Sequence, residues 1–131
     1  MTLPSTLVKL DATCFAWCKN LANVVLNQGL LDISTYVFNS CVLETIEIPR
    51  TVNYVRAQSF GSIKTLKTVT FKKRLNSDGT VFVPEISENA FAGSGTASAP
   101  VVFRVPWSEG QTPLAPWGAT NATIIYNYEE A

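Results

Sequence analysis

The stretch Leu43-Glu44-Thr45-Ile46-Glu47-Ile48-Pro49 occurs in related forms along this chain at a nearly constant interval. It returns 23 residues later as Leu66-Lys67-Thr68-Val69-Thr70-Phe71, and it occurs 22 residues earlier as Leu21-Ala22-Asn23-Val24-Val25-Leu26. Self-similarity at a fixed interval of this length predicts stacked repeats, in which each unit covers the apolar face of the next.

Apolar residues at other positions keep the same interval and support the repeat. One phase holds Leu3, Leu26, Ile48 and Phe71; a second holds Leu10, Ile33, Val55 and Ile86; a third holds Phe15, Phe38, Phe60 and Phe91. The apolar-polar alternation at the end of each unit predicts a strand with one side in the core. We therefore expect a β-rich, right-handed solenoid of about four coils, with parallel ladders and a continuous spine of stacked phenylalanines.

One unit breaks the interval, because Phe60 and Phe91 are 31 residues apart. The excess lies in residues 72–83, where Asp78-Gly79 between two β-prone arms predicts a hairpin that protrudes from the solenoid edge. The arm begins with Lys72-Lys73-Arg74, which we interpret as charges on a solvated arm in preference to an anion or nucleic-acid contact.

Composition narrows the function classes. Of the 131 residues, 47% are hydrophobic, which is enough to bury a core and argues against disorder. Ten basic and ten acidic residues cancel, so we expect no nucleic-acid partner. No run approaches the roughly 20 apolar residues that a membrane span needs, so we expect no insertion into a membrane. The first six residues have neither a basic nor an apolar leader region. We therefore expect a chain made in the cytoplasm, or a fragment of a longer protein.

The cysteine and histidine counts argue against a metal or cofactor site. Three cysteines, Cys14, Cys18 and Cys41, are too few for a zinc site and odd in number for a disulfide framework, and the chain has no histidine. Cys18 and Cys41 share a phase with Ile63, which indicates a packing position. We expect three buried free thiols, no metal and no cofactor.

The repeat resembles the BspA-type leucine-rich repeat. The residues that carry the resemblance are Leu43, Ile46, Ile48-Pro49, Thr51-Val52, Val55 and Ser59-Phe60, with Asn89-Ala90-Phe91 and the spacing from Phe38 to Cys41. Asn27 departs from the pattern, because proline is expected there. The resemblance implies a single domain over residues 1–131, with repeats at about 3–25, 26–47, 48–70 and 71–102 and a C-terminal strand and cap over 103–131.

The C-terminal tail resembles leucine-rich-repeat proteins of phage and prophage tail modules in Gram-positive bacteria. The residues concerned are Val105-Pro106-Trp107-Ser108-Glu109-Gly110, Ala115-Pro116-Trp117-Gly118 and Tyr126-Asn127. This resemblance implies a structural component of a phage tail or baseplate, assembled in the bacterial cytoplasm beside copies of itself or other tail proteins. The alternative is a cell-surface BspA-like adhesin fragment that binds a host or cell-surface protein or glycan.

The candidate binding residues lie on the outward side of the predicted strands, where repeat proteins usually contact partners. They are Glu44, Thr45, Glu47, Lys67, Thr68, Thr70 and Arg104, and plain solvent exposure is the alternative for all of them. Trp107 and Trp117 in the tail either cap the last coil or contact a glycan or another subunit. No paired carboxylates share a cleft with a histidine, so we expect no enzyme activity.

Overall fold

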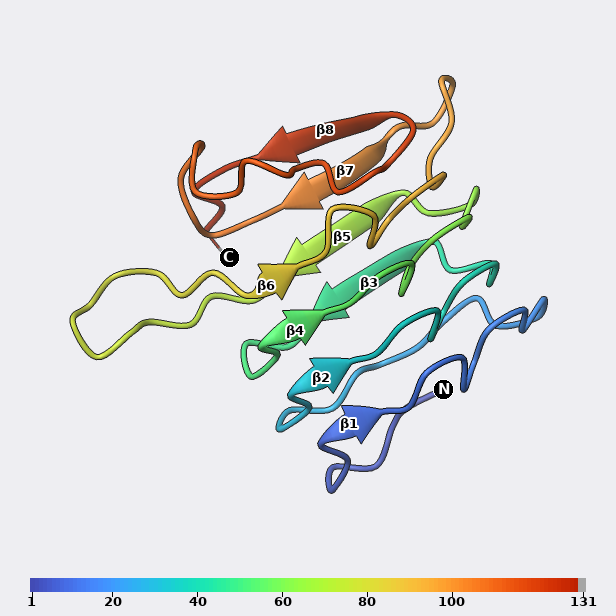
Figure 1. The fold of residues 1–131 in the computed structure, drawn as a ribbon, viewed down its shortest axis with the longest axis horizontal. Helices are drawn as coiled ribbons and strands as arrows, with labels where there is room; N and C mark the ends of the chain where they lie inside the picture. The colour runs from blue at the N-terminus through green and yellow to red at the C-terminus, as the bar shows by residue number, and fades with distance from the viewer. Residues whose placement is uncertain (130–131) are drawn as a thin grey trace.

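The eight strands found within the described residues form an all-β parallel solenoid of about five turns (Figure 1). A computed structural model describes residues 1–129. One ladder holds β1 (Lys9–Leu10), β2 (Asp32–Ile33), β4 (Tyr54–Val55) and β6 (Glu85–Ile86); the other holds β3 (Thr45–Ile48), β5 (Thr68–Phe71), β7 (Val101–Arg104) and β8 (Ala122–Ile125). The described residues include no helix long and apolar enough to cross a bilayer.

The register of both ladders confirms the predicted phases. Leu10 pairs with Ile33, and Val55 pairs with Ile86 in the first ladder. In the second ladder Ile46 pairs with Val69, which pairs in turn with Phe103. Every pairing is parallel, as expected when equivalent strands of successive coils stack. The interval in the sequence therefore reports the register of the fold directly.

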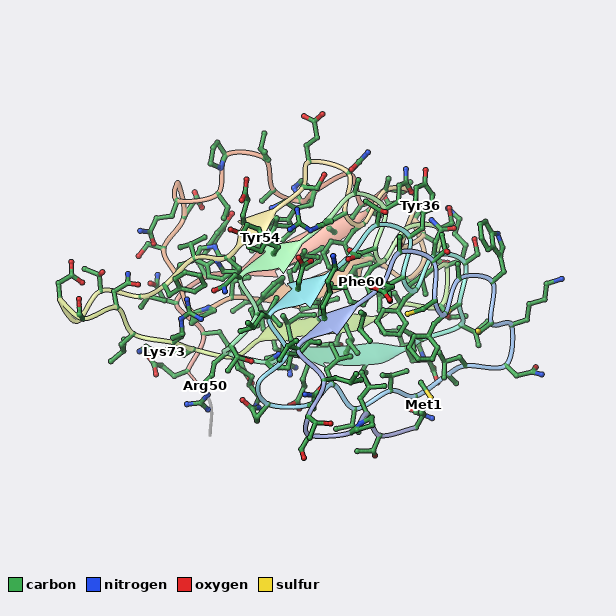
Figure 2. All side chains as sticks on the ribbon, turned by 60° about the horizontal axis from the view of Figure 1, so that its bottom comes forward. Met1, Tyr36, Arg50, Tyr54, Phe60 and Lys73 are labelled. Carbon is green, nitrogen blue, oxygen red and sulfur yellow. The ribbon has the colours of Figure 1, made fainter. Side chains whose placement is uncertain are left out.

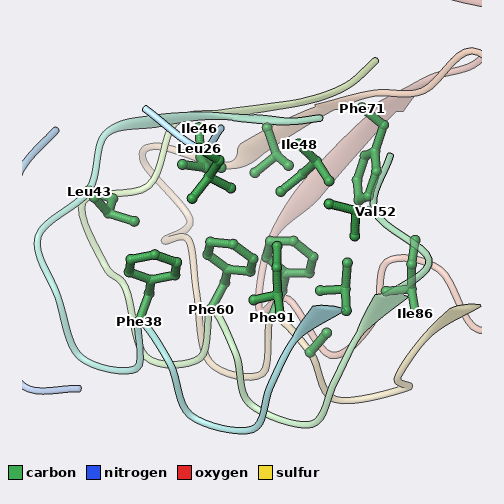
Figure 3. Close-up of a cluster of buried hydrophobic side chains, with 14 of the residues drawn as sticks. Leu26, Phe38, Leu43, Ile46, Ile48, Val52, Phe60, Phe71, Ile86 and Phe91 are labelled. Atoms are coloured by element: carbon green, nitrogen blue, oxygen red, sulfur yellow. The ribbon is translucent and has the colours of Figure 1, made fainter. Parts of the chain in front are cut away.

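A row of phenylalanines runs through the core between the two ladders. The ring centroids of Phe15, Phe38, Phe60 and Phe91 are 5.5, 5.3 and 5.2 Å apart in order, and the rings are stacked. Figure 3 shows the last three of these rings in line beneath Leu26, Ile46 and Ile48. The last three rings are fully buried, so the predicted spine is confirmed.

The backbone makes the same turn after each spine ring. Two residues after the ring, Trp17, Ser40 and Ser62 adopt φ between 55° and 62°. The next coil has Gly93 at this position, with φ of 74°. Only glycine adopts this region without a steric cost, so three of the four coils hold a side chain in a strained turn.

The insertion in the fourth unit is a hairpin, as predicted. Leu75 and Val81 form an antiparallel bridge on either side of Asp78-Gly79, and the arm extends well beyond the coils in Figure 1. The guanidinium of Arg74 anchors its base, because it lies 3.5 Å from the centroid of the Phe82 ring and donates to the Asn53 carboxamide oxygen at 3.0 Å.

The predicted cap forms a further turn of the solenoid, which is why about five turns replace the expected four. β8 pairs with β7 in parallel, with Phe103 opposite Ile124. Trp107 and Trp117 are both buried, each 1% exposed, and Trp117 packs edge-on against Phe103 with centroids 5.1 Å apart. The tryptophans therefore close the core at this end. The last two residues of the predicted cap, 130 and 131, lie outside the described part of the chain.

The three cysteines are free thiols, but only one is fully buried. Cys41 is 3% exposed and its thiol donates to the Phe15 carbonyl oxygen at 3.0 Å. Cys18 is half-buried, and Cys14 is exposed, which corrects the prediction of three buried thiols. Cys14 lies in the first coil of the described residues, and no other coil within residues 1–129 covers it.

Candidate binding surface on the strand face

The outward side chains of β3, β5, β7 and β8 form a surface that we call the strand face. The register places Glu47, Thr70, Arg104 and Ile125 in one column and Thr45, Thr68, Val102 and Thr123 in another. The repeat interval adds Val25 to the first column and aligns Glu44 with Lys67 in a third. The structure thus brings together seven of the nine predicted binding residues. Val25 and Ile125, which are 58% and 42% exposed, extend the first column with apolar groups.

The charges of the strand face are paired with one another. Lys67 lies 2.7 Å from Glu44, and its hydrogen bond lowers the pKa of the Glu44 carboxyl. Lys72 lies 3.4 Å from Glu47. The first contact is solvent-exposed, and in the second the exposed Glu47 meets a half-buried Lys72; ion pairs this open to water contribute little to stability. Their effect is to leave the strand face without a strong field of either sign.

Thr70 and Arg104 are more enclosed than their neighbours. Thr70 is 9% exposed because it lies between the longer side chains of Glu47 and Arg104. The Arg104 guanidinium lies 5.3 Å from the centroid of the Tyr128 ring, and its buried Nε has no hydrogen-bond partner among the described residues. Thr45 and Thr68, which are more open, are left as the accessible hydroxyls of this part of the surface.

The two tail tryptophans do not belong to the binding surface. Trp107 donates from its ring nitrogen to the Thr112 hydroxyl at 3.2 Å, and its ring packs against Phe71 with centroids 5.3 Å apart. Because both tryptophans are buried, the interpretation of exposed rings for a glycan or a neighbouring subunit is corrected. Their apolar area closes the last coil instead.

A groove of about 430 Å³ lies on the strand face beside β3. Its lining includes Asn23, Val25, Gln28, Thr45, Glu47 and Lys72. Two of these, Thr45 and Glu47, are among the predicted binding residues. The sequence offered no signal for a groove, since the residues before it have the same apolar alternation as β3.

The opposite ladder carries a second outward column that the sequence analysis missed. Lys9, Asp32, Tyr54 and Glu85 align along it. Arg56 forms two hydrogen bonds with the Asp32 carboxylate, both 2.8 Å, and lies 4.6 Å from the centroid of the Tyr54 ring. The same interval that located the strand face would have located this column.

The basic run at the hairpin is engaged within the chain. Lys73 lies 3.2 Å from Glu129, and Arg74 donates to main-chain oxygens of the preceding coil. Figure 2 shows Arg50 and Lys73 projecting on the same side of the hairpin base. The three charges are half-buried and not fully solvated, which corrects the picture of a freely solvated arm.

A sequence model described as the BspA type leucine rich repeat region matches residues 1–99 in six copies. The chain belongs to the BspA-type leucine-rich-repeat family. The described residues contain no group of three or more His, Cys, Asp or Glu side chains that could hold a metal ion. Leucine-rich-repeat solenoids typically serve as non-catalytic binding modules.

The BspA-type solenoid is similar in fold to the solved crystal structure of the pneumococcal vaccine antigen PcpA. The TM-score is 0.52 at 18% sequence identity, over all of this chain and 41% of that one. At this identity the similarity concerns the fold alone. The comparison with curated proteins found no match. None of these comparisons returned a phage or prophage protein, so the predicted tail role gains no support.

Proposed function

We propose that this BspA-type solenoid is a non-catalytic binding module of a bacterial cell-surface protein, and that its strand face contacts the partner. One observation carries the proposal. The outward columns of the strand face continue over successive coils, and exposed Thr45, Glu47 and Val25 lie among them with no other element of the described chain covering them. Such a continuous surface is the usual contact site of stacked repeats.

Two further facts support the surface location. A solved structure of similar fold is that of a pneumococcal vaccine antigen. The paired charges of the strand face suit a protein or glycan partner better than a strongly charged polymer, because no field of one sign accumulates there. The phage-tail role remains the second prediction, carried only by the resemblance of the tail.

The experiment measures binding of the fluorescently labelled chain to cultured epithelial cells by flow cytometry. We expect saturable binding, and a strand-face variant with Thr45→Arg and Thr68→Arg should bind at least about tenfold more weakly. Treatment of the cells with trypsin removes a protein partner, and treatment with periodate removes a glycan partner.

A matched control adds two arginines elsewhere. Val8 and Leu31 are exposed, precede β1 and β2, and are neighbours in successive coils, since the Leu31 amide donates to the Val8 carbonyl oxygen at 2.8 Å. The variant with Val8→Arg and Leu31→Arg should bind as the unmodified chain does. Equal binding by both double variants would contradict the assignment of the strand face.

A further inference from the structure

The ladder of the strand face is interrupted between the second and third coils. β3 pairs with β5 on one side, and it pairs with no strand on its other side within residues 1–129. The segment 22–28 of the preceding coil occupies the place where a strand would continue the ladder, yet no main-chain hydrogen bond joins it to β3 in this part of the chain. The groove of about 430 Å³ lies at this interruption.

The unpaired main-chain groups of β3 can be identified from its bonds to β5. The carbonyl oxygens of Glu44 and Ile48 accept hydrogen bonds of 3.2 and 3.0 Å from amides of the next coil. In a strand, the amide and carbonyl of each residue point to one side and those of the next residue to the other. The amides and carbonyls of Thr45 and Glu47 therefore point into the groove, without a partner among the described residues.

The opposite wall presents the same pattern. The Val25 amide donates to the Met1 carbonyl oxygen at 2.7 Å, and the Val25 carbonyl accepts from Leu3 at 3.0 Å. Val25 thus faces the first coil, so the main-chain groups of Val24 and Leu26 face β3. They too have no hydrogen-bond partner within residues 1–129. The groove is a slot with unpaired amides and carbonyls along both sides.

The slot has defined limits. At one end the Val42 amide donates to the Leu21 carbonyl oxygen at 3.2 Å; at the other the Thr51 hydroxyl donates to the Leu30 carbonyl oxygen at 2.7 Å. Behind it the two coils are in normal register through β2 and β4. Beneath it the side chains of residues 24, 26, 46 and 48 are buried in the core, so only main chain and outward side chains are open.

We propose that this slot binds an extended polypeptide segment of the partner, which adds to the free edge of β3 as a strand. The inference rests on the proposed function and assigns the class of ligand. Thr45 and Glu47 repeat at about 6.6 Å, the spacing of alternate residues in any parallel strand. Main-chain pairing of this kind provides affinity, and pockets for alternate side chains provide selectivity.

The surroundings of the slot favour a segment without a strong net charge. Glu47 is already paired with Lys72, and the other outward side chains of the lining are amides, a hydroxyl and Val25. The partner segment therefore contributes mainly its own amides and carbonyls. Residues that prefer strands, such as valine, isoleucine and threonine, suit the segment, and proline within it would remove a donor.

The first test asks whether the slot is open in the free chain. Amide hydrogen exchange measured by NMR should be slow at Thr68 and Thr70, whose ladder is complete, and at least about 100-fold faster at Thr45 and Glu47. Equal protection of Thr45, Glu47 and Thr70 would show a closed ladder and overturn the proposal.

The second test uses a displayed library of random heptapeptides as the probe. Peptides selected on the full chain should shift the NMR signals of Thr45 and Glu47. Glu47→Pro removes one slot-facing amide while leaving the bonds to β5, and an edge position tolerates proline. It should weaken the selected peptides at least about tenfold. The matched variant Glu47→Val makes the same change of charge but keeps the amide, so it should weaken the selected peptides clearly less than Glu47→Pro does.

The remaining outcomes separate this inference from the proposed function. Three outcomes would each overturn the strand-addition site. The library could give no binding peptide, the Glu47→Pro variant could bind the selected peptides as tightly as the unmodified chain, or the neutral oligosaccharide maltohexaose could shift the Thr45 and Glu47 signals in place of peptides. If the slot failed these tests but the Thr45→Arg, Thr68→Arg variant lost binding to epithelial cells, the proposed function would stand without the strand-addition site. Conversely, selected peptides that shift the two amides would support the slot even if no cell binding were found.

Discussion

Replacing Phe60 with alanine tests the central feature of the fold. Phe60 is fully buried and stacks on Phe38 and Phe91 with centroids 5.3 and 5.2 Å away. Its amide donates to the Ala90 carbonyl oxygen at 2.8 Å, so the backbone on either side is held and the site cannot collapse into the cavity. Removal of a buried phenylalanine costs about 3–5 kcal/mol, and loss of two ring contacts favours the upper part of that range.

Phe15 provides the internal control. It occupies the same phase but is only half-buried, and it has one stacked neighbour, Phe38, at 5.5 Å. We expect Phe15→Ala to cost about 2 kcal/mol, roughly half as much as Phe60→Ala, because less apolar surface returns to water and one ring contact is lost.

Urea unfolding followed by tryptophan fluorescence measures both changes, since Trp107 and Trp117 are buried in the folded chain. A conservative variant, Phe60→Leu, should cost about 1–2 kcal/mol and keeps the measurement possible if the alanine variant does not fold. A cost below about 1 kcal/mol for Phe60→Ala, or an equal cost for Phe15→Ala, would refute the stacked-coil account.

Three further predictions concern glycines, thiols and one ion pair. A methyl group at Gly95 would lie 2.7 Å from a main-chain oxygen, whereas nothing lies within 4 Å at Gly79, and both have positive φ; Gly95→Ala should therefore lower the free energy of unfolding by at least about 1 kcal/mol more than Gly79→Ala in urea titrations. Iodoacetamide should label Cys14 first and Cys41 only when the chain opens, as mass spectrometry will show. Partial desolvation of the Cys14 thiol and the negative charge of Asp11 raise its pKa, so its reaction at pH 8 should be slower than that of free cysteine. Arg56→Lys should lower the free energy of unfolding by about 0.5 kcal/mol in the same urea assay, because a lysine cannot form the two hydrogen bonds that Arg56 donates to the Asp32 carboxylate. An unchanged free energy of unfolding would show that water replaces that contact.

The side-chain pattern was sufficient to predict which residues stack. Ile46 and Val69, or Phe38 and Phe60, could be matched because each coil repeats the same covalent length, and parallel stacking places equal positions beside one another. The hairpin was predictable for a different reason, since Asp78-Gly79 has the backbone preference of a tight turn. The same matching predicted that seven of the nine candidate binding residues share one face; their role in binding stays a prediction.

The features that could not be predicted depend on distances and on the ends of the solenoid. Alternation shows that Val24 and Ile46 point inward, but it does not report whether their main chains approach within hydrogen-bond distance, so the slot was not anticipated. Cys14 and Trp107 illustrate the second limit. Cys14 is exposed because no other coil of residues 1–129 covers its side of the stack, and Trp107 is buried because the tail folds into a further coil.

The hairpin of residues 72–83 has a practical consequence for protein engineering. The coils that flank it keep the spacing of their neighbours, since the Phe60 and Phe91 rings are 5.2 Å apart despite the insertion. A joint that accepts extra residues without disturbing the stack is a natural graft point, because lengthening an exposed loop adds little to the entropy of its closure. Foreign epitopes displayed between Asp78 and Thr80 would project far from the coils on a rigid support.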